Sequence, residues 1–121
     1  VDDAAQEITD IVRGNDLLGS TPRQIYLQRL LGLPTPAYAH LPVAVDADGD
    51  KLSKQTGAPV VPLDDRVPLL YRVLVFLNQQ PPPELKNARL GEFWDWAIAH
   101  WRLAQVPRVP AIRAPADVLQ P

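Results

Sequence analysis

The chain has 121 residues, of which 46% are hydrophobic and 21% are charged, and its formal net charge is −2. This balance is typical of a folded globular protein and excludes a disordered chain. The absence of cysteine excludes disulfides and thiolate metal sites within these residues, and no apolar run approaches the roughly 20 residues that span a bilayer. We therefore expect a cytoplasmic protein with no membrane partner.

The start of the chain predicts a fragment of a longer protein. No methionine occurs, even at position 1. Residues 1–3 resemble the end of a buried strand whose earlier half lies before Val1. The neighbouring strands would then come from sequence outside this chain.

The first half alternates strand and helix signals. Residues 8–12 are rich in β-branched side chains and predict a strand. Ser20 or Thr21 can cap a helix that begins at Pro22 and runs to about Leu31. Residues 38–45 predict a second strand. Strand, helix and strand at this spacing favour a βαβ unit and a parallel sheet.

An acidic segment, Asp46–Asp50, follows the second strand. Its alternating acids imitate a calcium-binding loop. The sixth position of that loop requires glycine and is Lys51, and the twelfth requires glutamate and is Gly57. We therefore predict a solvated turn rather than a calcium site.

The second half has helical periodicity. A helix capped by Asp64 or Asp65 would carry apolar residues three and four apart and end at the prolines 81–83. A second helix, starting near Asn87, has an apolar stripe that favours core packing over a ligand platform. Its members are Leu90, Phe93, Trp94, Ala97, Ile98 and Trp101, with Trp96 off the stripe. The proline-rich tail after Trp101 predicts no regular element.

Two positions can handle anions. Lys51 and Lys54 flank Ser53 and could hold the phosphates of ATP, although most such clusters are solvated loops. Arg13 stands at the predicted carboxyl end of a strand, where it could clamp a carboxylate. A surface ion pair with Asp10 or Asp16 is equally favoured by the residues alone. His40 and His100 lack obvious catalytic partners and predict structural or exposed histidines.

The order of these motifs resembles the class I glutamyl-tRNA synthetases. Residues 13–17, Arg-Gly-Asn-Asp-Leu, match their Arg-Gly-Glu-Asp element with Asn15 in place of glutamate. Residues 51–55, Lys-Leu-Ser-Lys-Gln, are similar to their second signature, with Gln55 as a departure. Gln55, residues 78–83 and residues 96–101 resemble the glutamyl-Q tRNA(Asp) branch of this family.

The resemblance implies an α/β fold. Residues 1–58 would form the second half of a class I Rossmann-type catalytic domain that carries residues 51–55, which we call the lysine loop. Residues 59–121 would form a small all-α domain, similar to the stem-contact domain, with a proline-rich tail. The first signature and a zinc site would lie before Val1, so no metal is expected in this chain.

The resemblance also implies a reaction. Glutamate would be activated with ATP and Mg²⁺ and then transferred to the queuosine base of tRNA(Asp) by a monomeric enzyme. The catalytic residues would be Lys51, Ser53 and Lys54, and Arg13 would bind glutamate. The ATP-binding residues would be Lys51, Leu52, Ser53, Lys54, Gln55 and His40. The fragment alone is expected to be inactive.

Two alternatives remain. The chain could be the equivalent catalytic portion of a discriminating glutamyl-tRNA synthetase. It could also be a non-catalytic RNA-binding module that uses its helical half.

Overall fold

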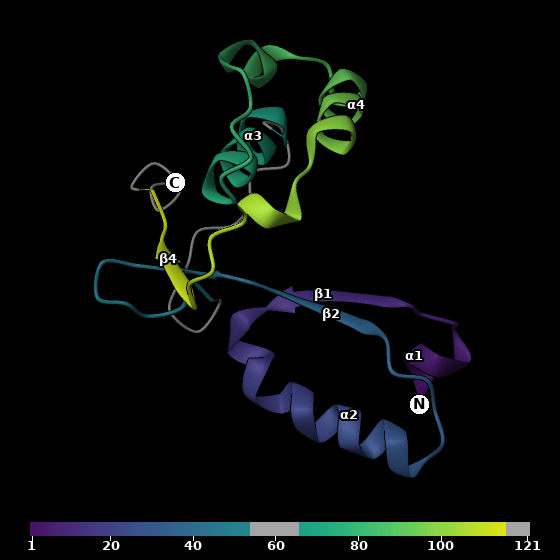
Figure 1. The fold of residues 1–121 in the computed structure, drawn as a ribbon. Helices are drawn as coiled ribbons and strands as arrows, with labels where there is room; N and C mark the ends of the chain where they lie inside the picture. The colour runs from purple at the N-terminus through teal and green to yellow at the C-terminus, as the bar shows by residue number, and fades with distance from the viewer. Residues whose placement is uncertain (54–65, 116–121) are drawn as a thin grey trace. The chain divides into compact units, whose positions relative to one another are not determined.

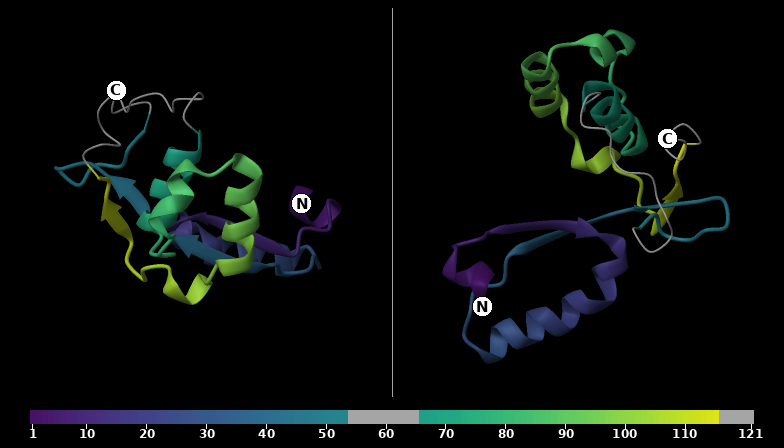
Figure 2. Two further views of the ribbon diagram at one scale, coloured as in Figure 1. Left: turned by 90° about the horizontal axis from the view of Figure 1, so that it is seen from above. Right: turned by 180° about the vertical axis from the view of Figure 1, so that it is seen from behind.

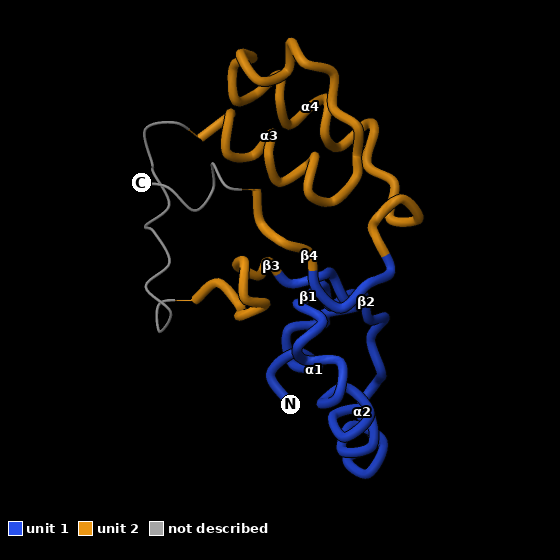
Figure 3. Tube along the Cα trace, turned by 90° about the vertical axis from the view of Figure 1, so that its left-hand side faces the viewer, with its two compact units in different colours: residues 1–43, 108–111 blue, residues 44–107, 112–121 orange. Residues whose placement is uncertain are grey.

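A computed structural model of the chain describes residues 1–53 and 66–115 (Figure 1). The chain divides into two compact units (Figure 3). Unit 1 comprises Val1–Val43 and Arg108–Ala111, and unit 2 comprises Ala44–Pro107 and Ile112–Pro121. In the described stretches no helix is long and apolar enough to cross a membrane. The expected domain boundary after residue 58 lies outside the described residues.

Unit 1 is a strand–helix–strand unit. Strand β1 (Asp10–Gly14) pairs in parallel with β2 (Ala37–Leu41), from Asp10 opposite Ala37 to Gly14 opposite Leu41. The 3₁₀ helix η1 (Asn15–Ser20) and helix α2 (Thr21–Leu30) connect them, and α2 runs alongside the strand pair (Figures 1 and 2). The predicted βαβ unit with parallel pairing is confirmed.

The ends of α2 follow from its sequence. Pro22 lies in the first turn, where its missing N–H is not needed. After the last helical residue, Gly32 has a φ of 66°, a left-handed conformation that glycine adopts without steric cost. The helix predicted from Pro22 to about Leu31 is therefore confirmed within a residue at each end.

The prediction for the N-terminal residues 1–3 is wrong. Residues 1–3 are not the end of a buried strand, because Asp2–Ala5 form the short helix α1, which has no buried residue. Asp2 and Asp3 stand in its first turn, where negative charge interacts favourably with the helix dipole. Strand β1 also begins later than predicted, at Asp10 rather than Ile8.

The predicted strand over residues 38–45 is interrupted. It divides at Pro42, which has no N–H to donate, into β2 and β3 (Val43–Val45). Strand β3 pairs with β4 (Ala111–Arg113). The prediction that the proline-rich tail has no regular element was therefore wrong: the Ala114 N–H donates to the Val45 carbonyl at 2.8 Å.

Unit 2 contains helices α3 (Arg66–Phe76) and α4 (Leu90–His100) and the 3₁₀ helices η3 (Pro83–Asn87) and η4 (Leu103–Gln105). Both predicted helices are confirmed, whereas the predicted caps Asp64 and Asp65 lie outside the described residues. Helix α3 ends at Phe76, before the prolines at 81–83 that were predicted to end it. Asn78 and Gln80, which follow it, have φ values of 57° and 52°, a left-handed conformation that does not continue a helix. Since β4 lies within residues 59–121, this range is not all helical.

The buried Gln79 fixes the loop after α3. Its side chain is only 4% exposed. Its amide nitrogen donates to the carbonyls of Leu77 (2.8 Å) and Arg102 (3.2 Å), and its oxygen accepts from the Arg102 N–H (2.8 Å). These bonds connect the end of α3 to the segment after α4 and satisfy a polar group that would be costly to bury alone.

The hydrophobic core lies in unit 2. Every buried leucine, valine, phenylalanine or alanine among the described residues belongs to it: Leu74, Leu77, Leu85, Phe93, Ala97, Val106 and Ala114. Core packing is confirmed for Phe93 and Ala97 of the predicted stripe. It is wrong for the other four members, which are exposed: Leu90 (38%), Trp94 (46%), Ile98 (77%) and Trp101 (37%). Trp96, predicted off the stripe, packs against the core. The neighbouring elements of unit 2 thus cover only part of the apolar surface of α4.

Candidate functional site

Arg13 lies at the carboxyl end of β1. Along this strand Ile11 and Arg13 are half-buried, while Asp10 and Val12 are exposed. Alternation places Ile11 and Arg13 on one face of the strand pair. In the parallel register Arg13 is opposite His40 of β2.

Three side chains accept hydrogen bonds from the Arg13 guanidinium. Nη1 donates to Gln24 Oε1 at 2.7 Å, Nη2 donates to Thr21 Oγ1, and Nε lies 3.4 Å from His40 Nε2. Its central carbon lies 4.9 Å from the centre of the Tyr38 ring. A guanidinium has five N–H donors, so one N–H on each terminal nitrogen is not used by these partners.

The partners of Arg13 also contact one another. Thr21, 6% exposed, has its Oγ1 2.8 Å from His40 Nε2 and 3.2 Å from the Leu17 carbonyl. The His40 ring stacks on Tyr38 with 6.3 Å between ring centres. We refer to Arg13, Thr21, Gln24, Tyr38 and His40 as the Arg13 cluster. It joins β1, β2 and the first turn of α2, which favours a positioned arginine over a surface ion pair.

A pocket of about 290 Å³ borders this cluster within unit 1. Arg13, Gln24 and Tyr38 contribute to its lining, together with Gln28, whose amide donates to the Tyr38 hydroxyl at 3.0 Å. The remaining lining is mainly aliphatic. Within the described part of the chain, Arg13 thus keeps N–H donors that Gln24, Thr21 and His40 do not use, and it borders a space of the size that a small molecule occupies.

The beginning of the lysine loop is a hairpin in unit 2. Val45 and Lys51 form an antiparallel bridge. Between them Asp46 Oδ1 accepts from the N–H groups of Asp48 and Asp50, both at 2.9 Å. The predicted turn is confirmed. Within residues 1–53 and 66–115, no group of three His, Cys, Asp or Glu side chains could hold a metal ion.

The predicted nucleotide residues are only partly described. Lys51 is exposed, and Leu52 and Ser53 are half-buried. Lys54 and Gln55 lie outside the described residues. Arg13 and His40 belong to unit 1 and Lys51 to unit 2, so the structure defines each half of the predicted site separately.

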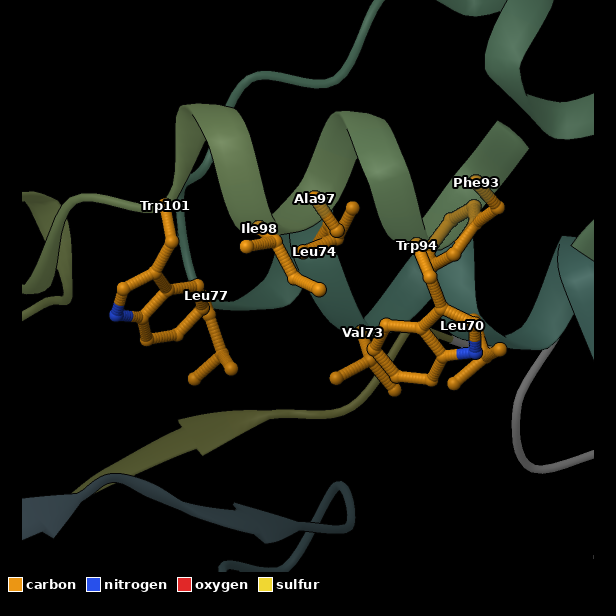
Figure 4. Close-up of a pocket in the computed structure, with 9 residues that line it drawn as sticks. All are labelled: Leu70, Val73, Leu74, Leu77, Phe93, Trp94, Ala97, Ile98 and Trp101. Atoms are coloured by element: carbon orange, nitrogen blue, oxygen red, sulfur yellow. The ribbon is translucent and has the colours of Figure 1, made fainter. Parts of the chain in front are cut away.

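Unit 2 carries an open apolar groove of about 260 Å³ between α3 and α4 (Figure 4). Five of the six residues of the predicted apolar stripe line it: Phe93 and Ala97 are buried at its base, whereas Trp94, Ile98 and Trp101 are exposed. The lining residues are Leu70, Val73, Leu74, Leu77, Phe93, Trp94, Ala97, Ile98 and Trp101.

Residues 1–66 match the family of class I tRNA synthetases (E and Q), catalytic domain. Since this match covers more than half of the 121 residues, the chain belongs to the class I tRNA synthetases of the glutamate and glutamine branch.

Within that branch, the chain is similar to proteins named glutamyl-Q tRNA(Asp) synthetase. It is 60% identical to that of Aromatoleum aromaticum over 95% of this chain and 36% of the relative. It is 53% identical to that of Thiobacillus denitrificans over 96% of this chain and 38% of the relative. The chain thus spans little more than a third of the length of these relatives.

Solved structures confirm the fold. The glutamate-tRNA synthetase of Elizabethkingia anophelis superposes with a TM-score of 0.65 over 98% of this chain and 27% of its own, at 20% identity. The glutamate tRNA ligase of Elizabethkingia meningosepticum, determined in complex with its amino acid, gives 0.64 with the same coverage. The predicted relation to the class I catalytic fold is confirmed, whereas the stem-contact role of residues 59–121 stays a prediction.

The residues around Arg13 were only partly predicted. The sequence predicted functional roles for Arg13 and His40, although with different substrates, and did not indicate Thr21, Gln24 and Tyr38 as their partners. Two signals point to them. Tyr38 and His40 alternate along a strand and therefore share a face, while Thr21 and Gln24 are three residues apart at the start of a helix and share a side.

Proposed function

We propose that this chain is part of an enzyme that activates glutamate with ATP and transfers the glutamyl group to the queuosine base of tRNA(Asp). The observation that carries the proposal is the Arg13 cluster, a fixed guanidinium with unused donors beside a pocket. Membership of the class I family supports it, as do the names of the relatives.

Arg13 binds a carboxylate of glutamate in this proposal. The guanidinium pairs with carboxylates through two N–H groups at once, which gives both affinity and orientation. Gln24, Thr21 and His40 restrain the group before substrate arrives. Little conformational freedom is then lost on binding.

The lysine loop handles ATP. Lys51, Ser53 and Lys54 stabilise the phosphates while the glutamate carboxylate attacks and pyrophosphate leaves, and Leu52 and Gln55 complete the ATP contacts. Positive charge helps most where negative charge develops in the transition state. ATP is expected with Mg²⁺, and no described residue is assigned to that ion. Residues 59–121 would contact tRNA(Asp) in the manner of a stem-contact domain.

The direct test is pyrophosphate exchange by the full-length enzyme that contains this chain. Glutamate should drive exchange of labelled pyrophosphate into ATP without tRNA, and aspartate or glutamine at the same concentration should not. Exchange driven by glutamine, or exchange that requires tRNA, would contradict the proposal. The Arg13→Ala variant is the matched control for dependence on this site.

A further inference from the structure

We propose that His40 and Thr21 are positioning residues that fix the Arg13 guanidinium for glutamate binding. This inference rests on the proposed role of Arg13 and adds to it a pair of neighbouring acceptors that determines the orientation of that side chain. It also predicts that His40 affects the binding of glutamate more than the binding of ATP.

The two acceptors match one edge of the guanidinium. Nε and Nη2 form a rigid planar fork. Nε faces His40 Nε2 at 3.4 Å, and Nη2 donates to Thr21 Oγ1. Thr21 Oγ1 and His40 Nε2 are also within hydrogen-bonding distance of each other, at 2.8 Å, so they present two adjacent polar atoms to this fork. The two contacts hold the guanidinium along its Nε–Nη2 edge, so rotation about the last side-chain bonds of Arg13 is restricted.

The hydrogen-bond roles follow from the chemistry of arginine, which is only a donor. His40 Nε2 therefore accepts from Arg13 Nε in this arrangement. A side chain without an acceptor at the position of Nε2 cannot replace histidine here. Glutamine can, because its amide oxygen reaches a similar distance from the backbone.

Packing fixes the positions of both acceptors. Thr21 is 6% exposed in the first turn of α2, and its Oγ1 also lies 3.2 Å from the Leu17 carbonyl. The His40 ring stacks on Tyr38, and the Arg13 guanidinium lies over the same Tyr38 ring. Since strand pairing, helix and aromatic ring restrain the two acceptors independently, the guanidinium is preorganised.

Steady-state kinetics of pyrophosphate exchange by the full-length enzyme test this inference. His40→Leu and Thr21→Val should each raise KM for glutamate by about tenfold, since a misplaced binding group loses affinity steeply. Both should leave KM for ATP within about twofold. His40→Gln and Thr21→Ser, which keep an acceptor, should restore most of the affinity for glutamate. Arg29→Gln, an exposed change on the same helix, should leave both KM values unchanged.

A second measurement does not depend on activity. In NMR spectra of the protein without substrates, the Arg13 Nε–H should exchange slowly with water in the wild type and in His40→Gln, and rapidly in His40→Leu. A larger change in KM for ATP than for glutamate would overturn the inference, as would unchanged exchange at Nε in His40→Leu. Absence of glutamate-dependent exchange in the wild type would instead refute the proposed function, and the NMR comparison would still decide the positioning role.

Discussion

Arg13 and His40 face each other across the parallel β1–β2 pair, with Arg13 Nε 3.4 Å from His40 Nε2. The two residues are 27 positions apart, and η1 and α2 together occupy most of the intervening chain. The βαβ connection thus brings a cation from one strand and an acceptor from the next to the same face, while the start of α2 supplies Thr21 and Gln24.

Replacement of Arg13 by lysine should impair glutamate binding selectively. An ammonium group cannot reproduce the three directed donors that engage Gln24, Thr21 and His40, nor pair with a carboxylate through two N–H groups. Arg13→Lys should raise KM for glutamate by at least tenfold in pyrophosphate exchange. A change confined to KM for ATP would place Arg13 in the nucleotide site instead.

Replacement of Lys54 should impair the chemical step. A positive charge beside the leaving pyrophosphate acts mainly in the transition state, so Lys54→Ala should lower kcat by roughly 10²–10³-fold. Burst kinetics of adenylate formation by the full-length enzyme measure this step directly. Exchange within threefold of the wild type would exclude this role.

Sequence patterns predicted the helices and the strand pair because their periodicity, caps and breakers are local. The Arg13 cluster is different, since its geometry depends on the register of two strands separated by a helix. His40 shows the limit: the family resemblance assigned it to ATP, whereas its side chain contacts Thr21 and Arg13. In the same way, periodicity marked the stripe of α4 as apolar but could not define how much of it the neighbouring elements cover.

Truncation of Phe93 should destabilise unit 2 strongly. This side chain is 1% exposed and belongs to the cluster with Leu74, Leu85 and Ala97. Phe93→Ala should cost about 3–5 kcal/mol through lost burial and a cavity. Hydrogen exchange of the α3 and α4 amides measures the loss. Ile98→Ala, at a position that is 77% exposed on the same helix, is the control and should change exchange little.

Acid should weaken the start of α4. The Glu92 carboxylate accepts from the Arg89 side chain at 2.7 Å and from the Arg89 N–H at 3.0 Å, which completes a capping box. Both hydrogen bonds lower the pKa of Glu92 below its ordinary value of 4.5. The bond from the Arg89 side chain has the larger effect, and the bond from the Arg89 N–H the next largest. The stabilisation is therefore fully present above pH about 4.5 and is lost as pH falls through the lower folded pKa.

Substitution of Glu92 tests this linkage. At neutral pH, Glu92→Gln should speed hydrogen exchange in the first turn of α4, because the charged bond to Arg89 is lost. The difference from the wild type should shrink toward pH 3, where the wild-type carboxyl is increasingly protonated. A difference that is constant with pH would show that the Arg89–Glu92 bond does not stabilise the helix.

The most direct test of the central claim is transfer of labelled glutamate by the full-length enzyme. With ATP present, label should enter tRNA(Asp) that contains queuosine and should not enter the same tRNA with unmodified guanosine at that position. Removal of the 3′-terminal adenosine should not reduce incorporation, because the proposed acceptor is the queuosine base. Incorporation that requires the 3′-terminal adenosine, or that occurs on tRNA(Glu) instead, would contradict this account.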